Sequence, residues 1–298
     1  MKIRQTVLAS ALLLAVPAAF AVQNIDRSQA TGASPSVEIN NVQGRVTVIA
    51  WDRQEVKVTG TIENDEHTFE FSGDAQRVVI SVRAKSGRSS YGRHDDALLD
   101  IRVPVAATLN VQTVSADIES RGVRGTQRLE SVSGDVFTEV FDEQLDLRTI
   151  SGDAEIRGSG GKARVYAEST SGDVRGRGLG AEVEAKSVSG DVNLELGAVS
   201  QVRLETVSGD VGARLTLADG ARLDARSVSG DVTLNFGQPV NGEFDVETFS
   251  GAIDNCFGPE PSKKSQYGPG RELRFTQGSG GARVSLETMS GDVEVCDR

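Results

Sequence analysis

One short phrase recurs through most of the chain. It is [Ser/Thr]-Φ-Ser-Gly-Asp-Φ, where Φ is apolar, with a degenerate first copy, Val-Ser-Ala-Asp, at Ser115. Successive copies lie 18 to 21 residues apart, except for a last step of 40. The serine that precedes the glycine falls at Ser133, Ser151, Ser171, Ser189, Ser208, Ser229, Ser250 and Ser290. A period of this length is typical of solenoids, in which each repeat stacks on the next.

Apolar and polar residues alternate on both sides of the phrase. Leu145, Leu147 and Thr149 lie six, four and two residues before one serine, and Val192 and Leu194 follow another glycine. This period of two indicates a strand on each side of a Ser-Gly-Asp corner. The sequence therefore predicts an all-β, parallel β-solenoid (β-helix) with rungs of 18 to 21 residues. We expect it to be right-handed, the hand favoured by parallel crossovers.

Charge alternates from copy to copy at the position three residues before the serine. In an in-register parallel stack these side chains lie about 4.8 Å apart, so opposite charges attract across neighbouring rungs. A slip of one rung would bring like charges together, so the column specifies register. Its members are Glu130, Arg148, Glu168, Lys186, Glu205, Arg226 and Glu247.

The position just before the serine is apolar in nearly every copy. This column either packs under a second layer or a wide corner, or forms an exposed stripe that docks a partner. Its members are Val132, Ile150, Val188, Val207, Val228, Phe249 and Met289, with Thr170 as the exception.

The repeated aspartates form a further column, in which Ala252 replaces one member. In one interpretation, glycine supplies unusual backbone angles and each aspartate bonds the amides of its own turn. In the other, the column is a Ca²⁺ ladder, because oxygen-rich turns bind hard cations. The nine-residue Gly-Gly-x-Gly-x-Asp rhythm of calcium β-rolls is absent. The aspartates are Asp135, Asp153, Asp173, Asp191, Asp210, Asp231 and Asp292.

Two cysteines occupy the same position of two successive copies. Cys256 lies six residues after Ser250, and Cys296 lies six residues after Ser290. Stacked strands would bring their Cα atoms to about 5 Å, within disulfide range. We therefore expect a disulfide at the C-terminal end and interpret residues 258–281 as an excursion from the stack.

The first 21 residues have the pattern of a secretory signal peptide. Lys2 and Arg4 precede an apolar run, and Ala19-Phe20-Ala21 forms the cleavage site. We expect an exported protein, in the periplasm or, alternatively, outside the cell. Residues 22–34 are expected to be flexible, and 114–298 to form the regular repeats. Residues 35–113 are either a β cap with the first rungs or a separate small β-domain.

Charge and motif content favour a binding protein over an enzyme. Loss of Lys2 and Arg4 takes the net charge from −11 to −13, which disfavours nucleic acid. His67 and His94 are the only histidines, lack metal-ligand spacing and are expected at the surface. The motifs of hydrolase, phosphate and zinc sites are absent. A β-helix enzyme acting on polysaccharides is the alternative from another class.

Two non-repeating segments carry basic and aromatic residues on this acidic chain. They are either solvated spacers or loops that bind an envelope protein or glycan. The first contains Arg88, Tyr91, Arg93 and His94, and the second contains Lys263, Lys264 and Tyr267.

The chain resembles the DUF4097 family, whose members are also labelled adhesins. The resemblance covers roughly residues 35 to 296 and lies in the repeats and three further segments: Gly44 to Thr59 with its Trp51-Asp52, Leu99-Asp-Ile-Arg-Val-Pro104, and Gly278-Ser-Gly-Gly-Ala-Arg-Val with Thr288-Met-Ser-Gly-Asp292. It implies a β-solenoid of bacterial envelope and exported proteins. It implies no catalytic residue and no cofactor.

Thermal unfolding separates the two interpretations of the aspartate column. A calcium ladder would raise the melting temperature in millimolar Ca²⁺ and lower it in EDTA, because a ligand that binds only the folded state stabilises it. A melting curve that neither reagent changes would exclude the ladder.

Overall fold

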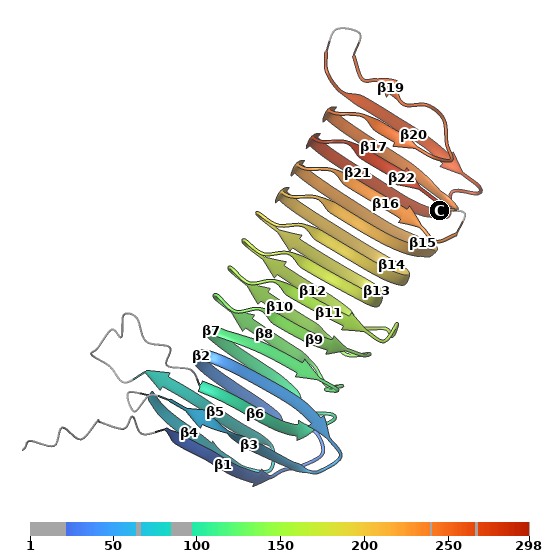
Figure 1. Cartoon of the computed structure of the whole chain (residues 1–298). Helices are drawn as coiled ribbons and strands as arrows, with labels where there is room; N and C mark the ends of the chain where they lie inside the picture. The colour runs from blue at the N-terminus through green and yellow to red at the C-terminus, as the bar shows by residue number, and fades with distance from the viewer. Residues whose placement is uncertain (1–21, 64–66, 85–96, 239, 266–267, 298) are drawn as a thin grey trace, which may run out of the picture.

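The chain folds into a stack of β-strands. The computed structural model describes residues 22–63, 67–84, 97–238, 240–265 and 268–297. This part of the chain contains strands and turns but no helix, and so no helix able to cross a membrane. Figure 1 shows the strands side by side in one elongated stack. The expected signal peptide, residues 1–21, lies outside the described residues.

Each rung of the stack consists of two limbs joined by a Ser-Gly-Asp corner. The pairs β8 (Gln127–Ser131) and β9 (Val136–Val140), and β10 (Leu145–Thr149) and β11 (Ala154–Gly158), each form one rung. Each limb pairs in parallel and in register with the same limb of its neighbours. The predicted parallel β-solenoid architecture is thus present in the regular repeats.

In the middle of the stack the links between rungs are themselves extended. After β12 (Arg164–Ser169), three long strands each run from the second limb of one rung into the first limb of the next. They are β13 (Val174–Ser187), β14 (Val192–Ser208) and β15 (Val211–Ser229). Register shifts in their pairing fall in the links, such as between Arg177 and Glu182, so the corners remain aligned although the repeats differ in length.

At the N-terminal end the rungs do not follow chain order. β2 (Ser36–Trp51) pairs in parallel with β7 (Thr108–Arg121) on one side. On its other side lie β5 (Arg77–Ala84) and β6 (Ala97–Pro104), which come later in the chain than β2. Antiparallel strands then cover this end: β3 (Glu55–Ile62) pairs with β6, and β4 (His67–Gly73) pairs with β5.

The segment expected to be flexible, residues 22–34, contains a paired strand. β1 (Gln23–Ala30) pairs antiparallel with β3 along its whole length, from Gln23 opposite Ile62 to Ala30 opposite Glu55. Only Ile25 of this strand is buried, so apolar periodicity gives little signal for it. Backbone hydrogen bonds to the open edge of β3 hold the segment in place.

The C-terminal end also departs from chain order. The last rung, β21 (Ala282–Ser290) and β22 (Val293–Cys296), lies between two earlier rungs. On one side it pairs with β15 and β16 (Val232–Phe236), and on the other with β17 (Gly242–Ser250) and β18 (Ile253–Asn255). In Figure 1, β21 and β22 accordingly lie between β16 and β17.

This order corrects the predicted charge column. Arg226 faces Glu287 across the rungs, and Glu247 lies one rung further out, beside Glu287. Opposite charges therefore still meet at Arg226, whereas Glu247 and Glu287 meet as like charges. The excursion contributes β19 (Ser262–Lys263) and β20 (Arg271–Gln277), and β20 covers β17 as an antiparallel strand.

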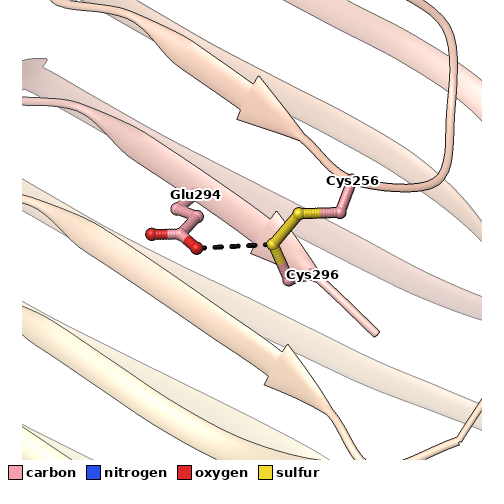
Figure 2. Close-up of side chains that lie close together, drawn as sticks. All are labelled: Cys256, Glu294 and Cys296. Atoms are coloured by element: carbon pink, nitrogen blue, oxygen red, sulfur yellow. Dashed lines mark hydrogen bonds between the residues drawn. A yellow bond between two sulfur atoms is a disulfide. The ribbon is translucent and has the colours of Figure 1, made fainter. Parts of the chain in front are cut away.

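The predicted disulfide joins Cys256 to Cys296. Their Cα atoms are 4.9 Å apart, and the backbone N–H of Cys256 donates to the carbonyl of Val295. Figure 2 shows the carboxylate of Glu294 beside this bond, with one oxygen 3.3 Å from the sulfur of Cys296. Because each sulfur is bonded to the other, neither is available as a thiolate ligand in this state.

The core is a thin column of aliphatic side chains from both limbs, mostly Val, Leu, Ile and Ala. Towards the C-terminal end four phenylalanines replace them. Phe244 and Phe275 are stacked with ring centroids 4.6 Å apart, and Phe236 and Phe257 meet Phe244 edge-to-face. This aromatic cluster lies where the excursion joins the stack, with Phe236 and Phe244 buried and Phe257 and Phe275 packed against them.

The corner glycines are required mainly because the backbones approach closely. A Cβ atom on Gly190 would lie 2.3 Å from the carbonyl oxygen of Gly172 in the preceding rung, and Gly152 has the same relation to Gly134 at 2.1 Å. The unusual backbone angle that the sequence suggests occurs at only two corners, where φ is 153° at Gly230 and 155° at Gly291. Glycine at this position therefore sets the distance between rungs.

Gly190→Ala tests this requirement. We expect a loss of roughly 1–3 kcal/mol or more in the free energy of unfolding, because the added methyl group must displace backbone. Gly197→Ala is the matched control in the link of the following rung, since its Cβ atom would contact Leu179 at an ordinary 3.6 Å. Urea unfolding followed by circular dichroism measures both. Equal effects of the two substitutions would contradict the close-contact explanation.

Candidate binding surface

A buried column of Ser and Thr side chains, two residues before the repeated serine, closes each corner from the inside. The hydroxyl of Ser131 accepts the N–H of Gly134 at 2.8 Å, and that of Thr149 accepts the N–H of Gly152 at 3.0 Å. In later rungs the hydroxyl donates instead, as from Ser187 to the carbonyl of Gly172 at 3.1 Å. Each buried hydroxyl thereby has a backbone partner, which offsets the cost of burying it.

The aspartate column links each rung to the next. The Oδ1 atom of Asp135 accepts the backbone N–H of Asp153 at 2.9 Å, and Asp191 accepts that of Asp210 at the same distance. This differs from the expected bonds to the amides of the same turn. The ladder begins at Asp117, and its acceptors continue through Asp135, Asp153, Asp173, Asp191, Asp210, Asp231 and Asp292.

The rung order explains why Ala252 replaces an aspartate. Asp231 accepts the N–H of Asp292, and Asp292 accepts the N–H of Ala252, both at 2.7 Å. Ala252 is therefore the last donor of the ladder, and in the described part of the chain no corner amide lies beyond it. A carboxylate at this position would have no amide to accept, so alanine suffices.

Hydrogen bonding stabilises the ionised form of Asp153 in this column. The N–H that Asp173 donates is the main cause that lowers the pKa of Asp153, and Arg175 lowers it further. The guanidinium of Arg175 bridges Asp153, at 2.8 Å, and Asp173. Amide and arginine donors thus offset part of the repulsion along the column.

Among the described residues, the repeated aspartates do not converge in threes on a position where a cation could bind. Among the described residues, the one group of three ligand side chains that converge within 4.8 Å is Cys256, Glu294 and Cys296. Each aspartate already uses one oxygen to accept an amide. The calcium ladder remains a prediction that the melting experiment tests.

The apolar column forms an exposed ridge along one edge of the stack. The exposed fraction of these side chains runs from 43% at Val132 to 57% at Phe249. Of the eleven large apolar side chains that are exposed among the described residues, eight belong to this column when Val114, from the degenerate first copy, is included. In spatial order the apolar ridge consists of Val114, Val132, Ile150, Thr170, Val188, Val207, Val228, Met289 and Phe249. The second layer that would cover it is absent from the described residues.

The predicted charge column runs beside the apolar ridge. Arg148 lies between Glu130 and Glu168, and ion pairs cross the rungs from Lys186 to Glu205 and from Arg226 to Glu287, each at 3.6 Å. At the end of the column, Lys264 and Arg274 lie 2.6 and 2.7 Å from Glu247. This explains how the like-charged neighbours Glu247 and Glu287 are tolerated.

A second outward column, two residues earlier in each rung, was missed in the sequence. It pairs with the first column along the strand, as between Arg128 and Glu130 at 2.7 Å and between Arg203 and Glu205 at 2.6 Å. Its charge is usually opposite to that of the first column, so the two form a chequerboard. The signal was available as Arg128, Asp146, Glu184, Arg203 and Asp224.

Tyr166 takes one uncharged position of this chequerboard. Burial raises the pKa of Tyr166 to about 12, and its hydroxyl donates to Glu168 at 2.6 Å. The guanidinium of Arg148 lies 5.2 Å from the centre of its ring. These contacts hold the ring within the charged face.

Of the other predicted site residues, Lys264 reaches the charge column, and several lie outside the described residues. Arg88, Tyr91, Arg93 and His94, together with Tyr267, lie outside the described residues. Lys263 is exposed in β19, and Lys264 forms the ion pair with Glu247. The expectation of a surface position for His67 is wrong: this side chain is 8% exposed, because β4 directs it inward.

Two substitutions at Asp191 test the aspartate ladder. Asp191→Ala leaves the N–H of Asp210 without its acceptor, and we expect it to lower the free energy of unfolding by roughly 1–2 kcal/mol. Asp191→Asn keeps a side-chain oxygen that can accept this N–H, so we expect a smaller loss. Urea unfolding at neutral pH compares the two. Equal losses would show that the charge, and not the accepted hydrogen bond, is what stabilises the corner.

Comparisons with known proteins identify the family of this chain. No curated protein matches the chain. One similar structure, from Clostridium sporogenes, is described as a "putative cell adhesion protein"; it is 9% identical, with a TM-score of 0.25, 93% of this chain covered and 100% of that one. Another, from Parabacteroides distasonis, is described as a "putative lipid binding protein"; it is 11% identical, with a TM-score of 0.47, 91% of this chain covered and 96% of that one. The sequence matches the family described as Toastrack DUF4097 over residues 29–296, so this chain belongs to the DUF4097 family.

Proposed function

We propose that this protein is a non-enzymatic binding module of the cell envelope, exported to the periplasm. Its right-handed β-solenoid serves as a rigid scaffold, adhesin-like in use, that presents the apolar ridge to a partner macromolecule. The signal-peptide pattern of residues 1–21 supports export. The one observation that carries the binding role is the exposed apolar ridge.

The fold itself does not require this position to be apolar. Thr170 occupies it in one rung, with the same backbone hydrogen bonds as its neighbours: its N–H donates to Thr149, as that of Val188 donates to Ser169. A polar residue is therefore compatible with the corner. Eight large apolar side chains in the other rungs expose surface at a cost in solubility, and contiguous exposed apolar surface is typical of an interaction site.

The acidic residues support a structural role over catalysis. The aspartates recur with the repeat and accept backbone amides, whereas the carboxylate pairs of polysaccharide-cleaving enzymes interrupt a repeat locally. The charge column is likewise paired along and across the strands. These groups hold the stack in register and frame the apolar ridge.

Site-specific photocrosslinking in cells tests the binding role. A photoreactive amino acid at Val188 places the probe on the apolar ridge, and one at Asn193 places it on the exposed side of the second limb of the same rung. We expect a discrete crosslinked species from Val188 and none from Asn193. A third probe at Lys263 reports on the excursion.

Three outcomes would change the proposal. Crosslinking from Lys263 alone would transfer the binding role to the excursion. Equal crosslinking from Val188 and Asn193 would show non-specific proximity. No discrete species from any of the three positions would contradict a binding module. Circular dichroism of each purified variant confirms that the probe has not unfolded the protein.

A further inference from the structure

We propose that the apolar ridge pairs with the apolar ridge of a second copy of this chain. The two stacks run antiparallel, and a two-fold axis passes midway between the rungs of Glu168 and Lys186. This inference rests on the proposed function, because it names the partner of the same surface. The order of the columns that flank the apolar ridge sets this alignment.

Three columns run in parallel along this edge of the stack. The charge column lies on one side of the apolar ridge, and the repeated serines, followed by the aspartate ladder, lie on the other. A two-fold axis along the stack would set the charge column of each copy against the aspartates of the other. Glu130, Glu168 and Glu205 would then face carboxylates. A two-fold axis perpendicular to the stack instead sets charge column against charge column and reverses the order of the rungs.

Reversal makes the alternating column complementary to itself. With the axis between the rungs of Glu168 and Lys186, these two residues face each other across the interface. Moving outward from the axis, Arg148 faces Glu205 of the second copy, and Glu130 faces Arg226. Every alternating charge thus meets its opposite, and each contact occurs twice by symmetry.

The ends of the column fit the same alignment. Glu287 and Glu247, the two like charges that end the alternation, face Gln112 and Asn40 of the second copy, which are uncharged. A shift of one rung in either direction would bring like charges together throughout. If one copy shifted by two rungs in one direction, Glu130 would face Glu247. In the other direction, the rungs of Glu287 and Glu247 would have no partner rung.

The apolar ridge follows this alignment along its length. Val114 meets Met289, Val132 meets Val228, and Ile150 meets Val207. The single polar member, Thr170, lies at the centre opposite Val188. The contact therefore covers the exposed apolar side chains of nearly every rung. Removing this apolar surface from water favours association.

The contact area indicates a dimer of modest affinity. Nine rungs at about 4.8 Å give a length of about 38 Å, and the four residues from the charge column to the serines span about 13 Å. The resulting area, about 500 Å² per copy, is below the roughly 800 Å² of a standard interface. We therefore expect association in the micromolar range, where light scattering shows a mass that rises with concentration from monomer to dimer.

Two single variants and their mixture test the alignment. Arg148→Glu and Glu205→Arg each place two like-charged contacts in the homodimer, and we expect each to weaken association at least about 10-fold. Mixing the two variants restores both contacts, because the glutamate of one then faces the arginine of the other. The mixture should therefore associate about as tightly as the wild type, which a folding defect in either variant would not produce.

Matched controls separate the apolar ridge from general effects. Arg157→Glu reverses a charge on the second limb of the Arg148 rung and should leave association unchanged. It is a matched control because each arginine is paired with an acid two residues earlier, Arg148 with Asp146 and Arg157 with Glu155. Val188→Asp should abolish association while the circular dichroism spectrum stays the same. A mixture no tighter than its single variants would overturn the alignment.

The outcomes distinguish this inference from the proposed function. A wild type that stays monomeric to about 100 μM, well above the micromolar constant expected here, would overturn self-association. If the probe at Val188 still gave a crosslink to another molecule, the binding role would stand and its partner would be different. If neither self-association nor a crosslink were found, both would fail.

Discussion

The close contact of successive corners is the constraint on which the structure depends. Corner glycines bring one backbone onto the next, at distances where a side chain would meet a carbonyl oxygen about 2 Å away. Within that contact the aspartate carboxylate accepts the amide of the following corner, and the buried Ser or Thr hydroxyl bonds to the glycine backbone. The repeated phrase is therefore a connector between rungs more than a turn within one.

Antiparallel strands end the parallel stacking of rungs at both ends of the molecule. A parallel stack leaves an open edge that can pair with another chain. Here β20 covers β17 at one end, and β3 and β4 cover β6 and β5 at the other. The corner ladder ends in the same place, at Ala252, because a covered edge needs no further acceptor. These antiparallel strands occupy edges of β17, β6 and β5 where another chain could otherwise pair.

The regular part of the fold could be predicted from the sequence because each rung repeats the same local pattern. The strands, the corners, the charge column and the disulfide all follow from spacing alone. The rung order could not, because the excursion between Cys256 and Ala282 is long enough to return on either side of β17. Ala252 held the missing information, because a residue without a carboxylate is suited to the end of the aspartate ladder and so marks its rung as the outermost.

The position of the apolar ridge could be predicted from the sequence, but its exposure could not. Periodicity shows that Val188 and its equivalents lie next to a corner, but not whether anything covers them. His67 and the strand from Gln23 to Ala30 were placed wrongly because their environment is set by edge pairing, which leaves little apolar pattern.

The inserted last rung has a consequence for how the chain acquires its structure during synthesis and export. A solenoid stacked in chain order can add each rung as it emerges, since each needs only the rung before it. Here the rung of β17 and β18 has no parallel neighbour on its inner side until β21 and β22 arrive. The outer rung can therefore join the stack only once residues 282–296 are present, so β21 and β22 must fold before β17 and β18 are held in place.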